Sequence, residues 1–185
     1  MGFFLQPGVP MKLNVAPFAL AFALTTTGFT AMATTPAQWQ AKTSNVQITL
    51  EQALQNAVKA VPGTVIEIEL DEGKGQGVRY EAEVLTPTGE SMDVWIDGAS
   101  GQARVHESNG KAKRKDQERA QAAKIDMPSA IRAATTHTPG KAVKAELDNH
   151  WGTVTYQVDV LQPDFTVMEV KVDASNGNVL RAKKD

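Results

Sequence analysis

The side chains most often used in metal binding and nucleophilic catalysis are scarce in this 185-residue chain. It has three histidines, His106, His137 and His150, and no cysteine. No histidine stands four residues from another or belongs to an H-E-x-x-H pattern, and no G-x-S-x-G motif occurs. We therefore predict no catalytic residue, no metal ligand and no cofactor, and expect a protein that is not an enzyme. The alternative, an enzyme, would need a concave pocket with convergent titratable groups.

Two short segments, Asp97–Gly101 and Asp173–Gly177, carry oxygen atoms that could bind Ca²⁺. Both lack the length and the closing glutamate of an EF-hand loop. A tight hairpin turn with glycine at a positive φ accounts for both segments. We therefore predict turns at these positions.

Two other segments could suggest nucleotide or nucleic-acid binding. The glycine-rich stretch Gly73–Gly77 lacks the G-x-x-x-x-G-K-[ST] spacing of a phosphate-binding loop, so we predict a loop between two strands. The basic run Lys111–Lys115 contains no aromatic residue. We interpret it as part of a solvated linker and expect no nucleic-acid partner. Contact with an anionic membrane is the alternative for this run.

The chain repeats itself. With an offset of 77 residues Ile48 aligns with Ile125, Pro62-Gly63 with Pro139-Gly140, and Leu70-Asp71 with Leu147-Asp148. The second copy then lacks one residue in a loop, and after it Tyr80 aligns with Tyr156. Two copies are too few for a solenoid, and each is large enough to be a small domain. The pattern indicates a tandem duplication.

Each copy is typical of a helix followed by antiparallel strands. In the first copy Thr49 and Gln52 predict a capping box, and Pro62-Gly63 ends the helix, with glycine suited to a left-handed cap. In the second copy Asp126 can cap the helix. Apolar and polar residues then alternate over 65–71, 78–84 and 92–96, which predicts strands with one buried face, and residues 102–105 predict a short fourth strand.

These elements predict an α+β fold made of two tandem copies of a helix packed on a three- to four-stranded antiparallel sheet. We place an N-terminal segment at residues 34–47, the first domain at 48–105, a basic linker at 106–124 and the second domain at 125–185. The linker is expected to become helical near Asp116, and the alternative is that residues 106–124 extend the second predicted helix at its N-terminus. Neither the oligomeric state nor a sheet shared by the two domains follows from the pattern.

The outer face of the first predicted sheet offers a binding surface. Alternation places Trp95 on this face together with Glu69, Glu81 and Asp93. Residues 48–105 hold ten acidic and four basic residues, whereas residues 125–185 hold eight and seven. An exposed tryptophan is a frequent interface anchor, and an acidic rim attracts a basic partner. We predict a partner-binding site at these four residues; the alternative is that the linker or the second copy covers Trp95.

The N-terminus is typical of a secretory signal peptide at residues 1–33. Lys12 precedes the apolar run Val15–Leu24, and Ala31-Met-Ala33 forms a cleavage signature. We predict cleavage after Ala33, a periplasmic or secreted product and no stable membrane insertion afterwards. The first ten residues lack signal character, so Met11 is an alternative start to Met1. The alternative to a signal peptide is a buried N-terminal helix.

The ordered set of these motifs resembles the PepSY domain. One copy is "TLEQALQNAVKAVPGTVIEIELD…YEAEV…MDVWIDGASGQARV" and the other is "DMPSAIRAATTHTPGKAVKAELD…YQVDV…MEVKVDASNGNVLRAK". PepSY domains occur in propeptides of secreted metallopeptidases and in small exported proteins, and the family shares no catalytic residues. The resemblance implies an exported binding protein that inhibits, chaperones or regulates a secreted or periplasmic peptidase or another envelope protein. The alternative is an envelope sensor that binds a small ligand or a cation on the acidic face.

Overall fold

The computed structural model describes residues 34–73, 77–150 and 152–185. The predicted signal peptide, residues 1–33, lies outside the described residues. The described residues belong to one compact unit. The described helices are α1 (Pro36–Ser44), α2 (Leu50–Ala60), α3 (Arg114–Ala122) and α4 (Met127–His137). The described strands are β1 (Thr64–Gly73), β2 (Gly77–Leu85), β3 (Glu90–Asp97), β4 (Ala103–Lys111), β5 (Lys141–His150), β6 (Thr153–Leu161), β7 (Val167–Asp173) and β8 (Val179–Lys184).

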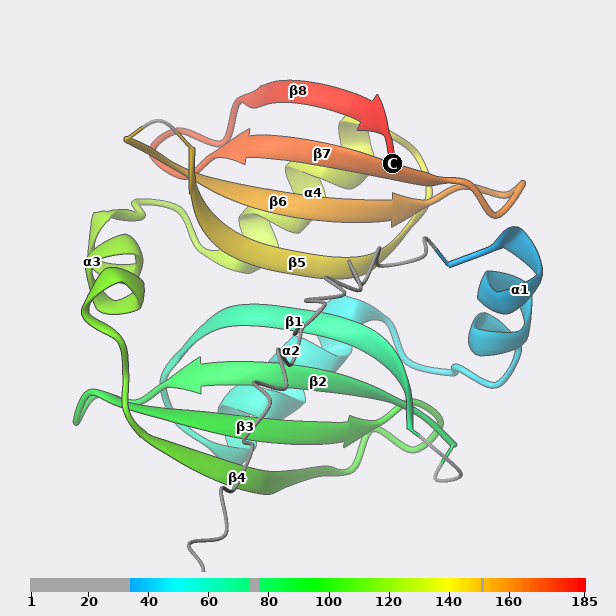
Figure 1. The fold of residues 1–185 in the computed structure, drawn as a ribbon. Helices are drawn as coiled ribbons and strands as arrows, with labels where there is room; N and C mark the ends of the chain where they lie inside the picture. The colour runs from blue at the N-terminus through cyan, green and yellow to red at the C-terminus, as the bar shows by residue number, and fades with distance from the viewer. Residues whose placement is uncertain (1–33, 74–76, 151) are drawn as a thin grey trace, which may run out of the picture. The chain divides into compact units, whose positions relative to one another are not determined.

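The described strands form a single antiparallel sheet in the order β4-β3-β2-β1-β5-β6-β7-β8 (Figure 1). The predicted fold class, two copies of a helix on a separate three- to four-stranded sheet, is therefore wrong. The reason lies at the first strand of each copy. β1 and β5 would each be an edge in a separate sheet, and here they pair with each other. Their pairing satisfies backbone groups that a free edge would leave exposed.

A pseudo-twofold axis passes through the junction between β1 and β5. Ile68 pairs with Ala145, which is its own counterpart in the repeat, and the flanking pairs are Glu67 with Glu146 and Glu69 with Lys144. A residue can pair with its own counterpart across antiparallel strands only where a twofold axis passes between them. The two copies are therefore arranged like the subunits of a dimer joined edge to edge.

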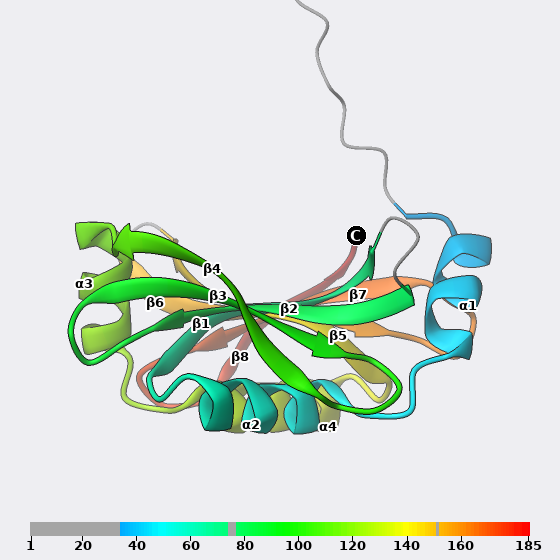
Figure 2. The same ribbon diagram turned by 90° about the horizontal axis from the view of Figure 1, so that it is seen from below.

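Helices α2 and α4 cover the same face of this sheet (Figure 2). The predicted capping box of α2 is confirmed, since Thr49 and Gln52 each accept from the other's backbone N–H, and Asp126 caps α4 as predicted. The two helices bury a matching set of side chains: Leu50, Ala53, Leu54 and Ala57 from α2, and Met127, Ala130, Ile131 and Ala134 from α4. They join one core with the inward-facing residues of both sets of strands.

The glycine of each Pro-Gly junction serves a different purpose from the predicted one. Neither Gly63 nor Gly140 has a positive φ. A Cβ atom on Gly63 would lie 2.3 Å from the carbonyl oxygen of Leu85, and one on Gly140 would lie 2.6 Å from that of Leu161. The repeat keeps glycine here because the backbone passes close to the end of a neighbouring strand, and the left-handed cap prediction is wrong.

The segments outside the predicted domains are ordered elements. β4 runs on to Lys111, well beyond the predicted end at Val105, and α3 follows within the segment interpreted as a linker. Helix α1 stands at nearly the same offset before α2 as α3 does before α4. The two helices lie at opposite ends of the β1–β5 junction (Figure 1). The repeat unit therefore begins one helix earlier than the sequence matches indicate.

None of the helices in the described part of the chain combines the length and the apolar character needed to cross a membrane.

Candidate functional site

The face of the sheet opposite α2 and α4, called the open face here, holds all four predicted site residues. Trp95 on β3 pairs with Glu81 on β2, and Glu81 pairs with Glu69 on β1. Asp93 lies two residues before Trp95 and pairs with Glu83. All four side chains are half-buried. The structure thus brings the predicted residues together as one continuous patch.

Trp95 is not a free ring on this patch. The imidazole of His106 stacks on the indole with centroids 3.5 Å apart and an interplanar angle of 16°. The guanidinium carbon of Arg79 lies 3.7 Å from the indole centroid. Two groups at van der Waals distance cannot share one face of a ring, so they cover opposite faces. We call this arrangement the Trp95 stack.

A β-bulge places His106 in the Trp95 stack. Asp93 pairs with Glu107 and Val94 pairs with Val105, so His106 is the extra residue on β4. An extra residue of this kind changes the direction of a side chain relative to the regular alternation. No sequence pattern predicted the bulge, since the predicted fourth strand ended before His106.

The carboxylates around the Trp95 stack are held by specific partners. Arg79 forms ion pairs with Glu81 and, at 3.5 Å, with Asp71. Asn109 donates to Asp93 over 2.9 Å. These contacts order the acidic side chains while leaving part of each one accessible to a partner.

Glu69 belongs to a charge cluster that crosses the β1–β5 junction. The ammonium of Lys144 lies 3.0 Å from Glu146, 3.2 Å from Glu67 and 3.8 Å from Glu69. Burial lowers the pKa of Lys144, but the hydrogen bond and charge of Glu146 and the charge of Glu67 outweigh it and raise that pKa above its ordinary value. Burial raises the pKa of Glu69, and Lys144 offsets this in part.

The two Asp-Gly segments are turns, as predicted. Asp97 accepts hydrogen bonds from the backbone N–H and the hydroxyl of Ser100, both at 2.7 Å, and Gly101 has a φ of 74°. Ser175 donates to Asp173 in the same way, and Gly177 has a φ of 80°. These hydrogen bonds lower the pKa of both carboxyl groups. Each carboxylate is engaged in holding its own turn.

The histidines and carboxylates do not converge. Within residues 34–73, 77–150 and 152–185 no group of three or more histidine, aspartate and glutamate side chains is arranged to hold a metal ion. His106 lies on β4 in the Trp95 stack, and His137 is the exposed last residue of α4. The side chain of His150 lies outside the described residues.

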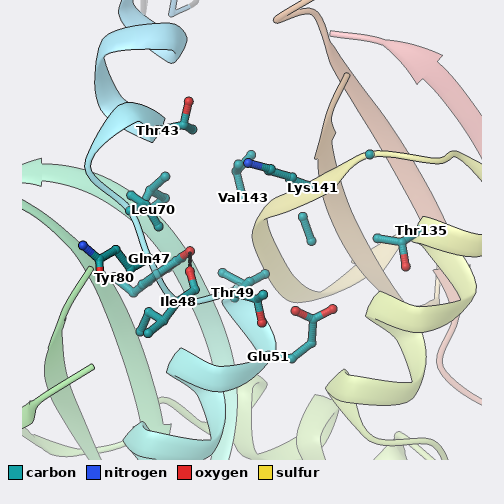
Figure 3. Close-up of a pocket in the computed structure, with 14 residues that line it drawn as sticks. Thr43, Gln47, Ile48, Thr49, Glu51, Leu70, Tyr80, Thr135, Lys141 and Val143 are labelled. Atoms are coloured by element: carbon teal, nitrogen blue, oxygen red, sulfur yellow. Dashed lines mark hydrogen bonds between the residues drawn. The ribbon is translucent and has the colours of Figure 1, made fainter. Parts of the chain in front are cut away.

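The structure also shows two pockets that sequence reasoning missed, and each is lined by residues of both copies. The first, called the Lys141 pocket here, has a volume of about 280 Å³ and is lined from the first copy by Ile48, Glu51 and Tyr80 and from the second by Thr135, Lys141 and Val143 (Figure 3). The second, called the Lys124 pocket, has a volume of about 470 Å³. Each draws its walls from both copies, so no local pattern in the sequence could have predicted it.

The match to a protein-family model agrees with the duplication. The model of the PepSY family, "Peptidase propeptide and YPEB domain", matches residues 47–104 and 124–183. The uncharacterized protein YkoJ of Bacillus subtilis (strain 168) is 28% identical over 146 residues, which cover 79% of this chain and 80% of YkoJ. The crystal structure of a predicted lipoprotein from Clostridium difficile 630 is similar with a TM-score of 0.42 and 17% identity, over 71% of this chain and 88% of that one. The chain belongs to the PepSY family and contains two copies of its domain.

Proposed function

We propose that this PepSY protein is exported, is not an enzyme, and binds a protein partner through the open face of its first copy. The partner class is a secreted or periplasmic peptidase, or another envelope protein that such a domain regulates. Two observations support this proposal. The matching family model is described as a peptidase propeptide domain, and the signal-peptide pattern of residues 1–33 is typical of export.

The observation that carries the proposed site is the acidic patch around the Trp95 stack. Glu69, Glu81 and Asp93 lie on neighbouring strands of one face, and their side chains are ordered by Arg79, Asn109 and Lys144. A preorganised patch loses little side-chain entropy when a partner binds. Excess negative charge on one face also speeds the approach of a positively charged surface. The proposed partner therefore presents basic residues to this patch.

The Trp95 stack changes the role that we assign to Trp95. Because Arg79 and His106 cover the two faces of the indole, a partner side chain cannot stack on it without displacing one of them. We assign Trp95 to holding Arg79 and His106 in place at the centre of the patch, with its edge available for contact. Replacing it with alanine would release both side chains and disorder the surrounding carboxylates.

The test begins with capture of a partner from an envelope extract by residues 34–185, followed by binding measurements with the purified partner. A triple variant, E69Q/E81Q/D93N, should bind at least about tenfold more weakly, with a slower association rate and a smaller salt dependence. Trp95→Ala should also weaken binding. The matched control, E72Q/E90Q/E118Q, removes three carboxylates elsewhere and should bind like the wild type. Equal affinity of the two triple variants would refute the proposed site.

A second candidate function, a small-ligand envelope sensor, is favoured by the Lys141 pocket. A ligand that binds only the folded state raises the melting temperature as its concentration rises. A thermal-shift screen of small metabolites therefore distinguishes this candidate from a protein-binding function. The open face would not be needed for such a response.

A further inference from the structure

The two pockets between α2 and α4 are related by the pseudo-twofold axis. The Lys141 pocket is lined by residues 46–51 and Tyr80 from the first copy and by residues 140–143 from the second. The Lys124 pocket is lined by the counterparts of most of these residues, namely 123–128 and Tyr156 from the second copy and residues 63–65 from the first. The duplication thus produced one type of cleft twice, where the start of one helix meets the Pro-Gly junction of the other copy.

The two pockets have diverged in their charged residues. Glu51 and Lys141 line the Lys141 pocket, and their counterparts in the Lys124 pocket are Pro128 and Thr64. Thr135, also in the Lys141 pocket, corresponds to the apolar Val58. At these positions only the Lys141 pocket carries a carboxylate and an ammonium group, on walls that come from different copies.

These two charges are available for a ligand. In the Lys124 pocket the carboxylate of Asp126 accepts the backbone N–H of Ser129 as the cap of α4. In the Lys141 pocket the neutral Thr49 caps α2, and the carboxylate of Glu51 is not needed there. Among the described residues neither Glu51 nor Lys141 forms an ion pair, in contrast to Lys144 on the open face.

The rest of the Lys141 pocket combines apolar side chains with the neutral polar residues Thr43, Gln47, Thr49 and Thr135. Leu50, Leu70 and Val143 are buried residues that reach its lining. The hydroxyl of Tyr80 donates to the carbonyl of Ile48 over 2.9 Å, and Lys42 donates to the carbonyl of Leu70 over 3.1 Å. Figure 3 shows Glu51 beside α2 and Lys141 extending from β5 on the other side of the pocket. The arrangement is a partly apolar hollow whose opposite walls carry one negative and one positive group.

We propose that the Lys141 pocket binds a small zwitterion with an apolar body, namely a dipeptide or free amino acid with aliphatic side chains. Glu51 would accept hydrogen bonds from its ammonium group, and Lys141 would donate to its carboxylate. Such charge-assisted hydrogen bonds are roughly twice as strong as neutral ones. The pocket volume of about 280 Å³ lies near the lower end of the range for ligand sites, roughly 300–1,000 Å³, which suits a ligand of this size.

The test is an NMR titration of the purified protein with the dipeptide Leu-Leu. Saturable shifts are expected in the amides of residues 49–51 and 141–143. The blocked analogue N-acetyl-Leu-Leu-amide, which carries neither charge, should bind at least about tenfold more weakly, because each charge-assisted contact is worth roughly a factor of ten or more. Glu51→Gln and Lys141→Met should each weaken binding of Leu-Leu to a similar extent.

The Lys124 pocket supplies the matched control. Lys124→Met removes an ammonium group from the pseudo-equivalent cleft and should leave Leu-Leu binding unchanged. The proposal is overturned if Leu-Leu produces no saturable shifts up to about 10 mM, a limit that corresponds to a binding free energy weaker than about 3 kcal/mol. It is also overturned if the blocked dipeptide binds equally well, or if neither pocket variant changes the affinity.

This inference stands apart from the proposed open-face function. The E69Q/E81Q/D93N variant carries its substitutions on the opposite face of the sheet and should retain Leu-Leu binding. Failure of the dipeptide titration would leave the partner-binding test intact, and the reverse also holds.

Discussion

Asp159 is a half-buried carboxyl group on the open face of β6. Its Oδ1 atom is buried and has no hydrogen-bond partner among the described residues. Burial raises the pKa of Asp159 to about 6; Lys144 offsets part of this effect, and Asp185, Glu169 and Glu146 add to it. At neutral pH the protein therefore carries an ionised group that folding has moved out of water.

Asp159→Asn should stabilise the protein at pH 7. Because the folded-state pKa lies above the ordinary value of 3.8, the free energy of unfolding falls as the pH rises from about 4 through about 6. Asparagine removes this loss, so the variant should gain about 1 to 3 kcal/mol at pH 7 and little at pH 4. Urea unfolding at the two pH values measures the difference. A variant less stable at pH 7 would mean that attraction between Asp159 and Lys144 outweighs the cost of burial.

Tyr80 and Tyr156 are the two tyrosines of the chain and occupy equivalent positions in the repeat. Each hydroxyl donates over 2.9 Å to the carbonyl of an isoleucine just before a helix, Ile48 or Ile125. Each ties the start of its helix to the second strand of its copy. Burial, with a smaller effect from a nearby carboxylate, raises the pKa of both phenols to about 12.

The double variant Tyr80→Phe/Tyr156→Phe should be less stable at pH 7 but less sensitive to alkali. Each substitution should cost roughly 0.5 to 1.5 kcal/mol at pH 7, because a carbonyl loses its partner. In the wild type the buried neutral phenols contribute fully to the free energy of unfolding below pH 10. This contribution is lost as the pH rises from 10 through about 12. Unfolding midpoints measured at pH 9 and pH 11 should therefore differ less in the variant. If the unfolding midpoint fell equally in both proteins between pH 9 and pH 11, the loss of stability would come from other groups, such as Lys144.

At the scale of secondary-structure elements, the Pro-Gly junctions decide how each helix enters its sheet. Gly63 and Gly140 lie against the carbonyl ends of Leu85 and Leu161, the last residues of β2 and β6. A side chain there would push the first strand away from the second. Proline ends the helix, and the following glycine permits the close approach of the backbone.

Gly63→Ala and Gly140→Ala should each destabilise the protein by about 1 to 3 kcal/mol, the usual cost of overpacking. In both cases the nearest atom is a backbone carbonyl oxygen, which cannot rotate away as a side chain can. Thr64→Ala and Lys141→Ala change the next residue of each junction, which is exposed, and should alter stability by no more than about 0.5 kcal/mol. Chemical denaturation of the four variants tests this comparison. If the glycine variants were as stable as Thr64→Ala and Lys141→Ala, the strands would have to shift freely to accommodate the added methyl group.

At the scale of the whole described unit, the β1–β5 pairing joins two duplicated domains into one sheet with one core. The charges at the junction differ between the copies. Glu67 corresponds to Lys144 in the repeat, so Lys144 faces carboxylates from both copies. A junction between two copies of the first domain would bring only carboxylates together there. The divergence therefore favours pairing of the first domain with the second.

The unit should unfold in a single cooperative transition. In a Trp151→Phe background the remaining tryptophans, Trp39 and Trp95, both precede the second copy. Ile131→Ala removes a fully buried side chain from the second copy and should cost about 2 to 5 kcal/mol. Tryptophan fluorescence and far-UV circular dichroism should then report the same lowered midpoint. A fluorescence midpoint that does not move would show that the copies unfold independently.

The sequence alone determined the features that depend on neighbours along the chain. These features were the duplication, the helix caps at Thr49 and Asp126, the turns at Asp97 and Asp173, and the face to which Trp95 belongs. They were predictable because capping, turn geometry and the side-chain periods of helices (3.6 residues) and strands (2 residues) act over a few residues. The same periodicity assigns Glu69, Glu81 and Asp93 to the same face as Trp95.

Only the tertiary structure decided what happens between distant segments. Alternation tells which face of a strand is buried and says nothing about which edge is paired, because the backbone groups at an edge are the same for every residue. The continuous sheet through β1 and β5 was therefore invisible in the sequence, and the pockets built from both copies depend on it. The Trp95 stack depends on a bulge in the pairing of β3 with β4, and such a register shift is likewise set by the contact between strands.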